Sequence, residues 1–129
     1  MKSDNVESFA FIAVNDLVAI TRGRSLPKSD LNLARGVGWV PADLALNGFG
    51  ALANPNPFGA FGDLRLIPDM SIKAVFRGDE FGGDVEIYLA DQYTMDGNPW
   101  ECRPRSSVKQ AIECLRGDHG VEVVASFGV

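Results

Sequence analysis

Few side chains of this 129-residue chain could do chemistry on their own. The single histidine, His119, stands beside Asp118 just after a predicted helix, where contact with solvent or with the helix C-terminus is a sufficient explanation for it. The carboxylates occupy predicted turns and strand ends, and no pair has the helical spacing of a metal motif. They are Asp63, Asp69, Asp79, Glu80, Asp84, Asp91 and Asp96. We therefore expect neither a complete active site nor a metal site within this chain.

Two other groups that bind ligands in many proteins lack their usual neighbours here. Cys102 and Cys114 have no CxxC partner and stand at opposite ends of a predicted helix, so we interpret them as inert, unbridged thiols. Gly48-Phe49-Gly50 lacks the third glycine and the following helix of a dinucleotide-binding fingerprint, so it is weak support for phosphate binding.

Charge and hydropathy argue against further classes of protein, namely those that bind nucleic acid, span a membrane or are secreted. A net charge of −5 argues against a nucleic-acid partner. The small arginine pairs Arg22/Arg24 and Arg103/Arg105 could each grip a carboxylate or a phosphate, although a solvated surface is the commoner reason for such pairs. No apolar run approaches the ~20 residues that span a bilayer, and the N-terminus lacks the apolar core of a signal peptide. We expect a cytosolic protein without a membrane partner.

The most unusual stretch is a loop at residues 48–62, which contains four glycines and two prolines and has no hydrophobic period. Long loops in compact domains are usually functional, and this one carries three aromatic rings, Phe49, Phe58 and Phe61. It leads through Asp63 into the alternating segment at residues 64–67, which predicts a rigid strand. We expect the rings to pack against the domain itself or against a partner outside this chain.

Apolar runs and alternation predict the elements around this loop. Residues 9–14 form a buried strand that pairs with residues 18–21 in a hairpin about Asn15-Asp16-Leu17. In the segment at residues 84–91, Val85, Ile87 and Leu89 share one face, whereas Glu86 and Tyr88 share the other. Further strands are predicted at residues 64–67, 72–76 and 121–127, with a helical turn within residues 25–33 and a strand or helical turn within residues 36–46.

One helix is predicted, over residues 104–116, and Gly117 stands where it would stop. Val108, Ala111, Ile112 and Leu115 form an apolar stripe, which we expect to cover the sheet. This order of elements indicates one α+β domain over residues 1–129, with a mixed sheet and one main helix packed on one face. Because apolar strand residues reach the last position, we expect the natural chain to continue past it.

Short motifs follow one another in order from residue 9 to the C-terminus. They are Asp16 with Arg22-Gly23-Arg24, Gly36-Val37-Gly38, Pro41-Ala42, the run GDLRLIPD at residues 62–69, Asp96-Gly97 with Pro99-Trp100, Pro104-Arg105, and Phe127-Gly128-Val129. Each motif is weak alone, but their order and spacing resemble the N-terminal β-grasp domain of the glutamine synthetase family. The resemblance is closest to the branch that includes the γ-glutamylpolyamine synthetases.

The resemblance implies a β-grasp fold within an ATP-dependent ligase, in which the γ-carboxylate of glutamate is phosphorylated and ammonia or an amine then displaces the phosphate. ATP and Mg or Mn would bind a large C-terminal domain, so this chain alone is expected to be inactive and to hold neither. Its partners would be the C-terminal catalytic domain of the same chain and that of a neighbouring subunit in a homo-oligomeric ring. The loop would close the neighbour's active site. The implied loop and interface residues are Asn47, Gly48, Phe49, Phe58, Phe61 and Asp63.

Two positions depart from the family pattern. Asn47-Gly48 stands where the family commonly has an aspartate that helps to bind and deprotonate the attacking ammonium, and an amide cannot be that base. Arg103 stands where the family usually caps the helix with aspartate, so the helix start is expected to rely on Ser106 or on water. A different hypothesis is a stand-alone β-grasp module that recognises a partner through its loop or its sheet edge and has no catalytic role.

Overall fold

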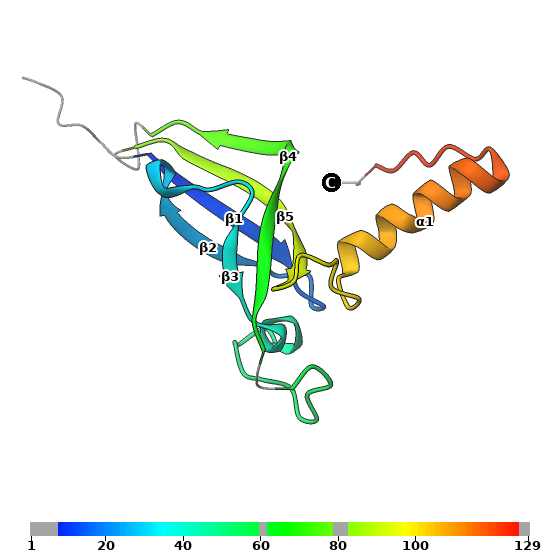
Figure 1. Cartoon of the computed structure of the whole chain (residues 1–129), viewed down its shortest axis with the longest axis horizontal. Helices are drawn as coiled ribbons and strands as arrows, with labels where there is room; N and C mark the ends of the chain where they lie inside the picture. Colours follow the sequence, from blue (N-terminus) through cyan, green and yellow to red (C-terminus); the bar gives the residue numbers. More distant parts are fainter. Residues whose placement is uncertain (1–7, 60–61, 79–82, 127–129) are drawn as a thin grey trace, which may run out of the picture.

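A five-stranded mixed sheet organises the chain (Figure 1). The computed structural model describes residues 8–59, 62–78 and 83–126. The strand order is β2-β1-β5-β4-β3; β1 and β5 are parallel, and the other neighbours are antiparallel. The elements are β1 (Phe9–Asn15), β2 (Thr21–Pro27), η1 (Lys28–Asp30), β3 (Val37–Trp39), η2 (Pro41–Ala45), β4 (Leu64–Phe76), β5 (Val85–Thr94) and α1 (Pro104–His119). The predicted α+β class with a mixed sheet and one main helix is confirmed.

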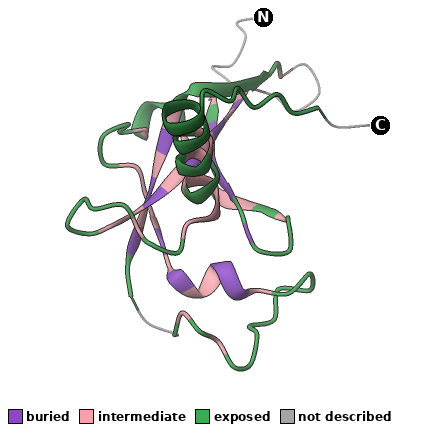
Figure 2. Ribbon diagram, turned by 90° about the vertical axis from the view of Figure 1, so that its right-hand side faces the viewer, coloured by how far each residue is buried: buried purple, intermediate pink, exposed green. Residues whose placement is uncertain are grey.

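The core lies on one face of this sheet, and Figure 2 shows the buried residues in the strands and in η2. Ile12 of β1 and Leu66 of β4 have no exposed surface, and Trp39 of β3 packs in the same cluster. Burial of an aliphatic side chain of this size contributes about 1.5–3 kcal/mol. Leu64 and Leu66 thus anchor the strand that follows the loop, as the sequence predicts.

The buried face of β5 is the one that carries polar residues. Glu86 is 6% exposed and accepts hydrogen bonds from Lys28 Nζ, at 2.5 Å, and from the Tyr88 hydroxyl. These hydrogen bonds, that of Lys28 above all, hold the pKa of Glu86 below its ordinary value despite burial. Burial and the Glu86 carboxylate raise the pKa of Tyr88 to about 12. Alternation separates the two faces of this strand correctly, but Glu86 can lie inward only because Lys28 of η1 and Lys73 of β4, whose Nζ is 3.7 Å from Glu86 Oε2, pair with it.

The first hairpin differs from the prediction. Residues 18–20 lie in the turn, and β2 runs from Thr21 to Pro27, whereas the sequence pattern predicts a second strand that begins at Val18 and ends near residues 22–24. Val18 is 50% exposed, and Ala19 has a positive φ of 62°. The cause is Asp16, whose Oδ1 accepts hydrogen bonds from Val18 N and Ile20 N and closes a wider turn than the apolar pattern indicates.

Two segments predicted as separate strands form the single long strand β4. Its pairing with β5 shifts register between Pro68 and Lys73. Proline donates no backbone hydrogen bond, so an irregularity of the ladder at this point is expected. The remaining short predictions are confirmed, since η1 lies within residues 25–33, and β3 and η2 lie within residues 36–46.

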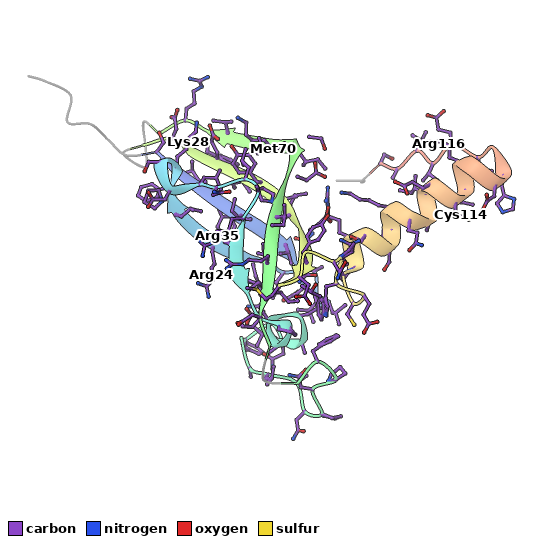
Figure 3. All side chains as sticks on the ribbon, viewed as in Figure 1. Arg24, Lys28, Arg35, Met70, Cys114 and Arg116 are labelled. Atoms are coloured by element: carbon purple, nitrogen blue, oxygen red, sulfur yellow. The ribbon has the colours of Figure 1, made fainter. Side chains whose placement is uncertain are left out.

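The predicted covering of the sheet by the helix is wrong. No residue of α1 is buried, Val108 is 60% exposed, and Figure 1 shows only the N-terminal end of α1 beside the strands. At that end, carboxylates of the sheet pair with cationic side chains of α1, so the cationic side of the helix faces the sheet. Cys114 and Arg116, labelled in Figure 3, lie on the part of α1 that projects away from the sheet. Both cysteines are free and exposed.

The C-terminal predictions need two further corrections. The helix continues through Gly117 to His119, and Gly120 in the left-handed conformation, with φ 63°, closes it. Residues 121–126 pair with no strand among the described residues, although a strand is predicted at residues 121–127; Phe127-Gly128-Val129 lies outside them. No helix in the described ranges has both the length and the apolarity needed to cross a membrane.

Two strand glycines form a matched pair for a stability test. A Cβ at Gly23 of β2 would stand 2.1 Å from the backbone oxygen of Ile12, whereas a Cβ at Gly38 of β3 would meet nothing closer than the end of the Arg65 side chain at 4.0 Å. We predict that Gly23→Ala lowers the free energy of unfolding by about 1–3 kcal/mol, because the neighbouring backbone must shift. Gly38→Ala should change it by less than ~0.5 kcal/mol. Urea unfolding monitored by circular dichroism measures both, and equal effects would contradict the packing of β2 on β1.

Candidate functional site

The loop predicted to be functional begins with a closed turn built by Asn47. Its side-chain Oδ1 accepts hydrogen bonds from Phe49 N at 2.9 Å and from Ala51 N at 3.0 Å. Its backbone N–H donates to Ala51 O, and its backbone oxygen accepts from Gly50 N. Asn47 therefore acts on its own loop by the side-chain-to-backbone bonding typical of asparagine in turns. We call residues 47–51 the loop head.

The loop head is attached to the sheet by Arg22. The Nη2 of Arg22 donates to the backbone oxygen of Asn47 at 2.9 Å, and its Nε donates to Asp16 Oδ2 at 2.5 Å. Burial would raise the pKa of Asp16, but the hydrogen bond from Arg22 and two backbone hydrogen bonds outweigh it and hold the pKa below its ordinary value. Arg22 thus joins the hairpin turn and the loop head.

The aromatic residues of the loop have different environments. Phe49 is fully exposed. Phe58 is partly buried and packs edge-to-face on Trp100, with ring centroids 5.6 Å apart. Phe61 lies outside the described residues. Of the two alternatives for the rings, Phe58 packs on the domain itself, whereas Phe49 contacts nothing that would bury it.

The other predicted loop residues do not gather around a reactive group. Gly48 is exposed on the loop head, and Asp63 is exposed immediately before β4. Phe58 belongs to a second closed turn, in which its N–H donates to Asn56 Oδ1 at 3.0 Å and Asn56 Nδ2 donates to Gly59 O at 2.7 Å. The structure therefore brings together Asn47, Gly48 and Phe49 and leaves Phe58 and Asp63 at separate places.

A cluster of four charged side chains joins α1 to the sheet. Asp69 of β4 and Asp91 of β5 face Arg105 and Lys109, which lie one helical turn apart. Arg105 contacts Asp69 at 2.6 Å and Asp91 at 2.9 Å, and Lys109 contacts them at 3.0 Å and 2.9 Å. We call these residues the helix-docking cluster.

The pKa values in the helix-docking cluster shift in the directions expected of ion pairs. Hydrogen bonds from Ser71, Arg105 and Lys109 lower the pKa of Asp69. Burial would raise the pKa of Asp91, but hydrogen bonds from Lys109 and Arg105 lower it overall. The same contacts raise the pKa of Lys109 against the effect of burial. All four groups therefore remain charged near neutral pH.

Two cavities lie beside the helix-docking cluster. One, of about 620 Å³, separates the first turns of α1 from the sheet and is lined mainly by apolar residues, including Leu89 and Val108. Gln92 also lines it, and the buried Nε2 of Gln92 lacks a hydrogen-bond partner. The other, of about 520 Å³, is lined by polar residues with Tyr93 and Trp100. Neither cavity brings together a nucleophile and a base.

The described residues do not fit a divalent metal ion. Within residues 8–59, 62–78 and 83–126, no three His, Cys, Asp or Glu side chains group in a way that could hold one. The buried carboxylates are already paired with lysine or arginine of this chain. His119 is exposed at the end of α1.

Sequence reasoning missed the residues that hold the site together. For Arg22 the sequence leaves two interpretations, a solvated surface charge or a residue that binds a carboxylate, and the structure shows the second, with Asp16 as the carboxylate. The spacing of Arg105 and Lys109 shows in the sequence that both lie on one side of a helix. What the sequence lacks is the register of β4 on β5, which places Asp69 and Asp91 opposite that side.

The comparisons with known proteins agree on one kind of domain. A family model described as the glutamine synthetase N-terminal domain matches residues 1–100. A crystal structure of a novel glutamine synthase homolog is 33% identical, with a TM-score of 0.82, over 92% of this chain and 29% of that one. No curated protein matches.

Two more distant structures support the fold alone. The cryo-EM structure of Plasmodium falciparum glutamine synthetase is 15% identical, with a TM-score of 0.65, over 92% of this chain and 21% of that one. GmaS without ligand is 23% identical, with a TM-score of 0.60, over 85% of this chain and 24% of that one. The chain thus spans less than a third of the length of each of the three structures.

The helix-docking cluster makes a prediction about stability and pH. Asp91→Asn should lower the free energy of unfolding at pH 7 by about 1–3 kcal/mol, because two cations lose a charged acceptor. The pKa of Asp91 in the folded state lies below its ordinary 3.8, so its contribution is complete above that pH and is lost as the pH falls further. The difference from the wild type should therefore shrink in acid. Glu122→Gln, at an exposed carboxylate beyond the end of α1, is the control in urea unfolding. A similar loss in the control, or a difference that persists in acid, would contradict the role of the cluster.

Proposed function

The chain belongs to the glutamine synthetase N-terminal domain family, and from this membership we propose that it is the N-terminal β-grasp domain of an ATP-dependent glutamate–ammonia or glutamate–amine ligase. In the proposed reaction, ATP transfers its terminal phosphoryl group to the γ-carboxylate of glutamate. Attack by the amine on that acyl phosphate forms the amide and releases phosphate and a proton. The observation that carries the proposal is the family match, which covers residues 1–100 and includes the whole loop.

We propose that this domain contributes to the reaction through its loop head. Phe49 is fully exposed on a turn whose backbone accepts or donates hydrogen bonds with Asn47 and Arg22. Its ring therefore has a defined position from which it can contact another surface. A rigid turn loses less conformational entropy when it docks than a free loop would. We propose that this surface belongs to the catalytic domain of a neighbouring subunit in a homo-oligomer, where the loop head excludes water from the reacting groups.

The loop head does not supply the base in this proposal. The amide of Asn47 cannot accept the proton of an attacking ammonium, and its Oδ1 is already bonded to two backbone N–H groups. Deprotonation of the amine therefore belongs to a group outside the described residues. We propose that ATP and Mg or Mn bind there as well, because the buried carboxylates among the described residues are paired with cations of this chain.

A second candidate is a stand-alone β-grasp interaction module. The observation in its favour is the edge of β4, because β3 pairs only with Leu64–Leu66 and leaves the rest of that edge unpaired by it. An extended peptide could add to such an edge through backbone hydrogen bonds. A reading frame that continues past Val129 into a catalytic domain would favour the ligase, and a stop codon there would favour the module.

The direct test is a ligase assay of the natural full-length protein. Glutamate and Mg-ATP are supplied with ammonia or with one of a panel of mono-, di- and polyamines, and phosphate release is measured together with the amide product. We expect release of phosphate that depends on one of these amines and equals the amide formed. Phosphate release that no amine increases would reject the proposal.

The exposed ring supplies a sharper test in the same assay. We predict that Phe49→Ser lowers kcat/KM for the amine about tenfold or more, because the docked loop head loses the burial of an aromatic ring, worth about 1.5–3 kcal/mol. Met95→Ser, at a position that is 55% exposed outside the loop, is the control and should leave kcat/KM unchanged. Thermal unfolding should be unaffected in both variants. Equal kcat/KM values for the two variants would rule out docking through Phe49.

A further inference from the structure

The first hairpin and the loop head, which are far apart in the sequence, meet at one end of the sheet. Asp16 directly follows strand β1, Arg22 lies in the edge strand β2, and Asn47 opens the loop head. The guanidinium of Arg22 lies between the other two, with Nε on Asp16 Oδ2 at 2.5 Å and Nη2 on the backbone oxygen of Asn47 at 2.9 Å. In the sequence Arg22 is six positions from Asp16 and 25 positions from Asn47, and the structure makes the three residues one connected group.

Both ends of this connection are turns closed by a side-chain oxygen. Asp16 Oδ1 accepts from Val18 N at 3.0 Å and from Ile20 N at 2.8 Å, which fixes the hairpin turn. The amide of Asn47 does the same for the loop head through Phe49 N and Ala51 N. Because each end is rigid by itself, the bridging hydrogen bonds of Arg22 set the position of one turn relative to the other.

The sheet end of the bridge is buried and the loop end is not. The side chain of Asp16 is 2% exposed and that of Arg22 is 20% exposed, whereas Asn47 is exposed. A buried carboxylate must keep a cationic partner, so Asp16 holds the guanidinium in place from the inside. The planar guanidinium then presents a second N–H in a fixed direction toward the loop.

We infer that Arg22 is a positioning residue: held by Asp16, it sets the place of the loop head, and with it the place of the Phe49 ring, against the sheet. The effect on catalysis rests on the function proposed above; the structural link does not. A lysine at this position would keep the ion pair with Asp16. It would not span both acceptors, because an ammonium is a single point on a flexible chain.

Arg24 provides a matched control within the same strand. It lies two residues beyond Arg22 on the same face of β2, carries the same charge and is exposed (Figure 3). Arg24→Gln therefore removes an arginine and a positive charge without touching Asp16 or Asn47. Three variants, Arg22→Lys, Arg22→Gln and Arg24→Gln, distinguish the effect of losing the bridging hydrogen bonds from the effect of losing a positive charge.

The first measurement is backbone hydrogen exchange of the natural full-length protein, read by mass spectrometry on peptides that cover residues 16–21 and 46–53. Arg22→Lys should speed exchange in the loop-head peptide at least fivefold and leave the hairpin peptide unchanged, since the ion pair with Asp16 remains. Arg22→Gln should speed both, and Arg24→Gln should change neither. Peptides from β5 report whether a variant has lost its fold. Unchanged exchange of the loop head in Arg22→Lys would overturn the inference, whatever the kinetics.

The second measurement is steady-state kinetics of the same proteins. Arg22→Lys should raise KM for the amine at least fivefold, with KM for ATP unchanged, because only the step that needs the placed loop is affected. An unchanged KM for the amine with a faster-exchanging loop head would refute the effect on catalysis. If the wild type shows no ligase activity, the proposed function fails, and hydrogen exchange still decides whether Arg22 positions the loop head.

Discussion

A carboxylate taken out of water must keep a cationic partner, and the structure of this domain depends on that constraint at three places. Asp16 holds Arg22, Glu86 holds Lys28, and the aspartates of β4 and β5 hold the first turns of α1. In each case the cation comes from a different element than the carboxylate. The pairs therefore do what apolar contacts do in other domains: they fix the position of a turn, a 3-10 helix and the α-helix on one sheet.

This arrangement explains why α1 lies as it does. The helix has an apolar stripe, and the sheet has a partly apolar face in Val85, Ile87 and Leu89, yet the two do not cover each other. The helix-docking cluster gives α1 a directional attachment at its beginning, and hydrophobic contact, which has no direction, does not hold the remainder. Only the first turns contact the sheet through ion pairs, so the docking of α1 depends largely on charge.

The loop head links these ion pairs to the proposed function. A glycine- and proline-rich loop would ordinarily sample many conformations, and ordering it on a partner would cost about 1–2 kcal/mol per residue. Here two asparagines close small turns within the loop, and Arg22 ties the first turn to the hairpin. The part that carries the exposed ring of Phe49 is thus held in place by this chain's own hydrogen bonds, and this is the physical basis of the role proposed for the loop.

The sequence by itself determined β1, β5 and the two halves of β4, the helix, the α+β class and, through the order of its motifs, the family. These follow from local properties: alternation predicts strands, 3.6-residue spacing predicts the helix, and turn residues mark their ends. It also singled out Phe49, because a loop with that composition is rare, and Asn47, through the resemblance to the family. Only the tertiary structure decided that Asp16 moves the start of β2 to Thr21, that Arg22 reaches Asn47, and that Glu86 lies inward beside Lys28. The first depends on side-chain hydrogen bonds within a turn, which the apolar pattern does not show. The other two depend on which residues meet across the fold, and no local pattern encodes the strand register and loop path that bring them together.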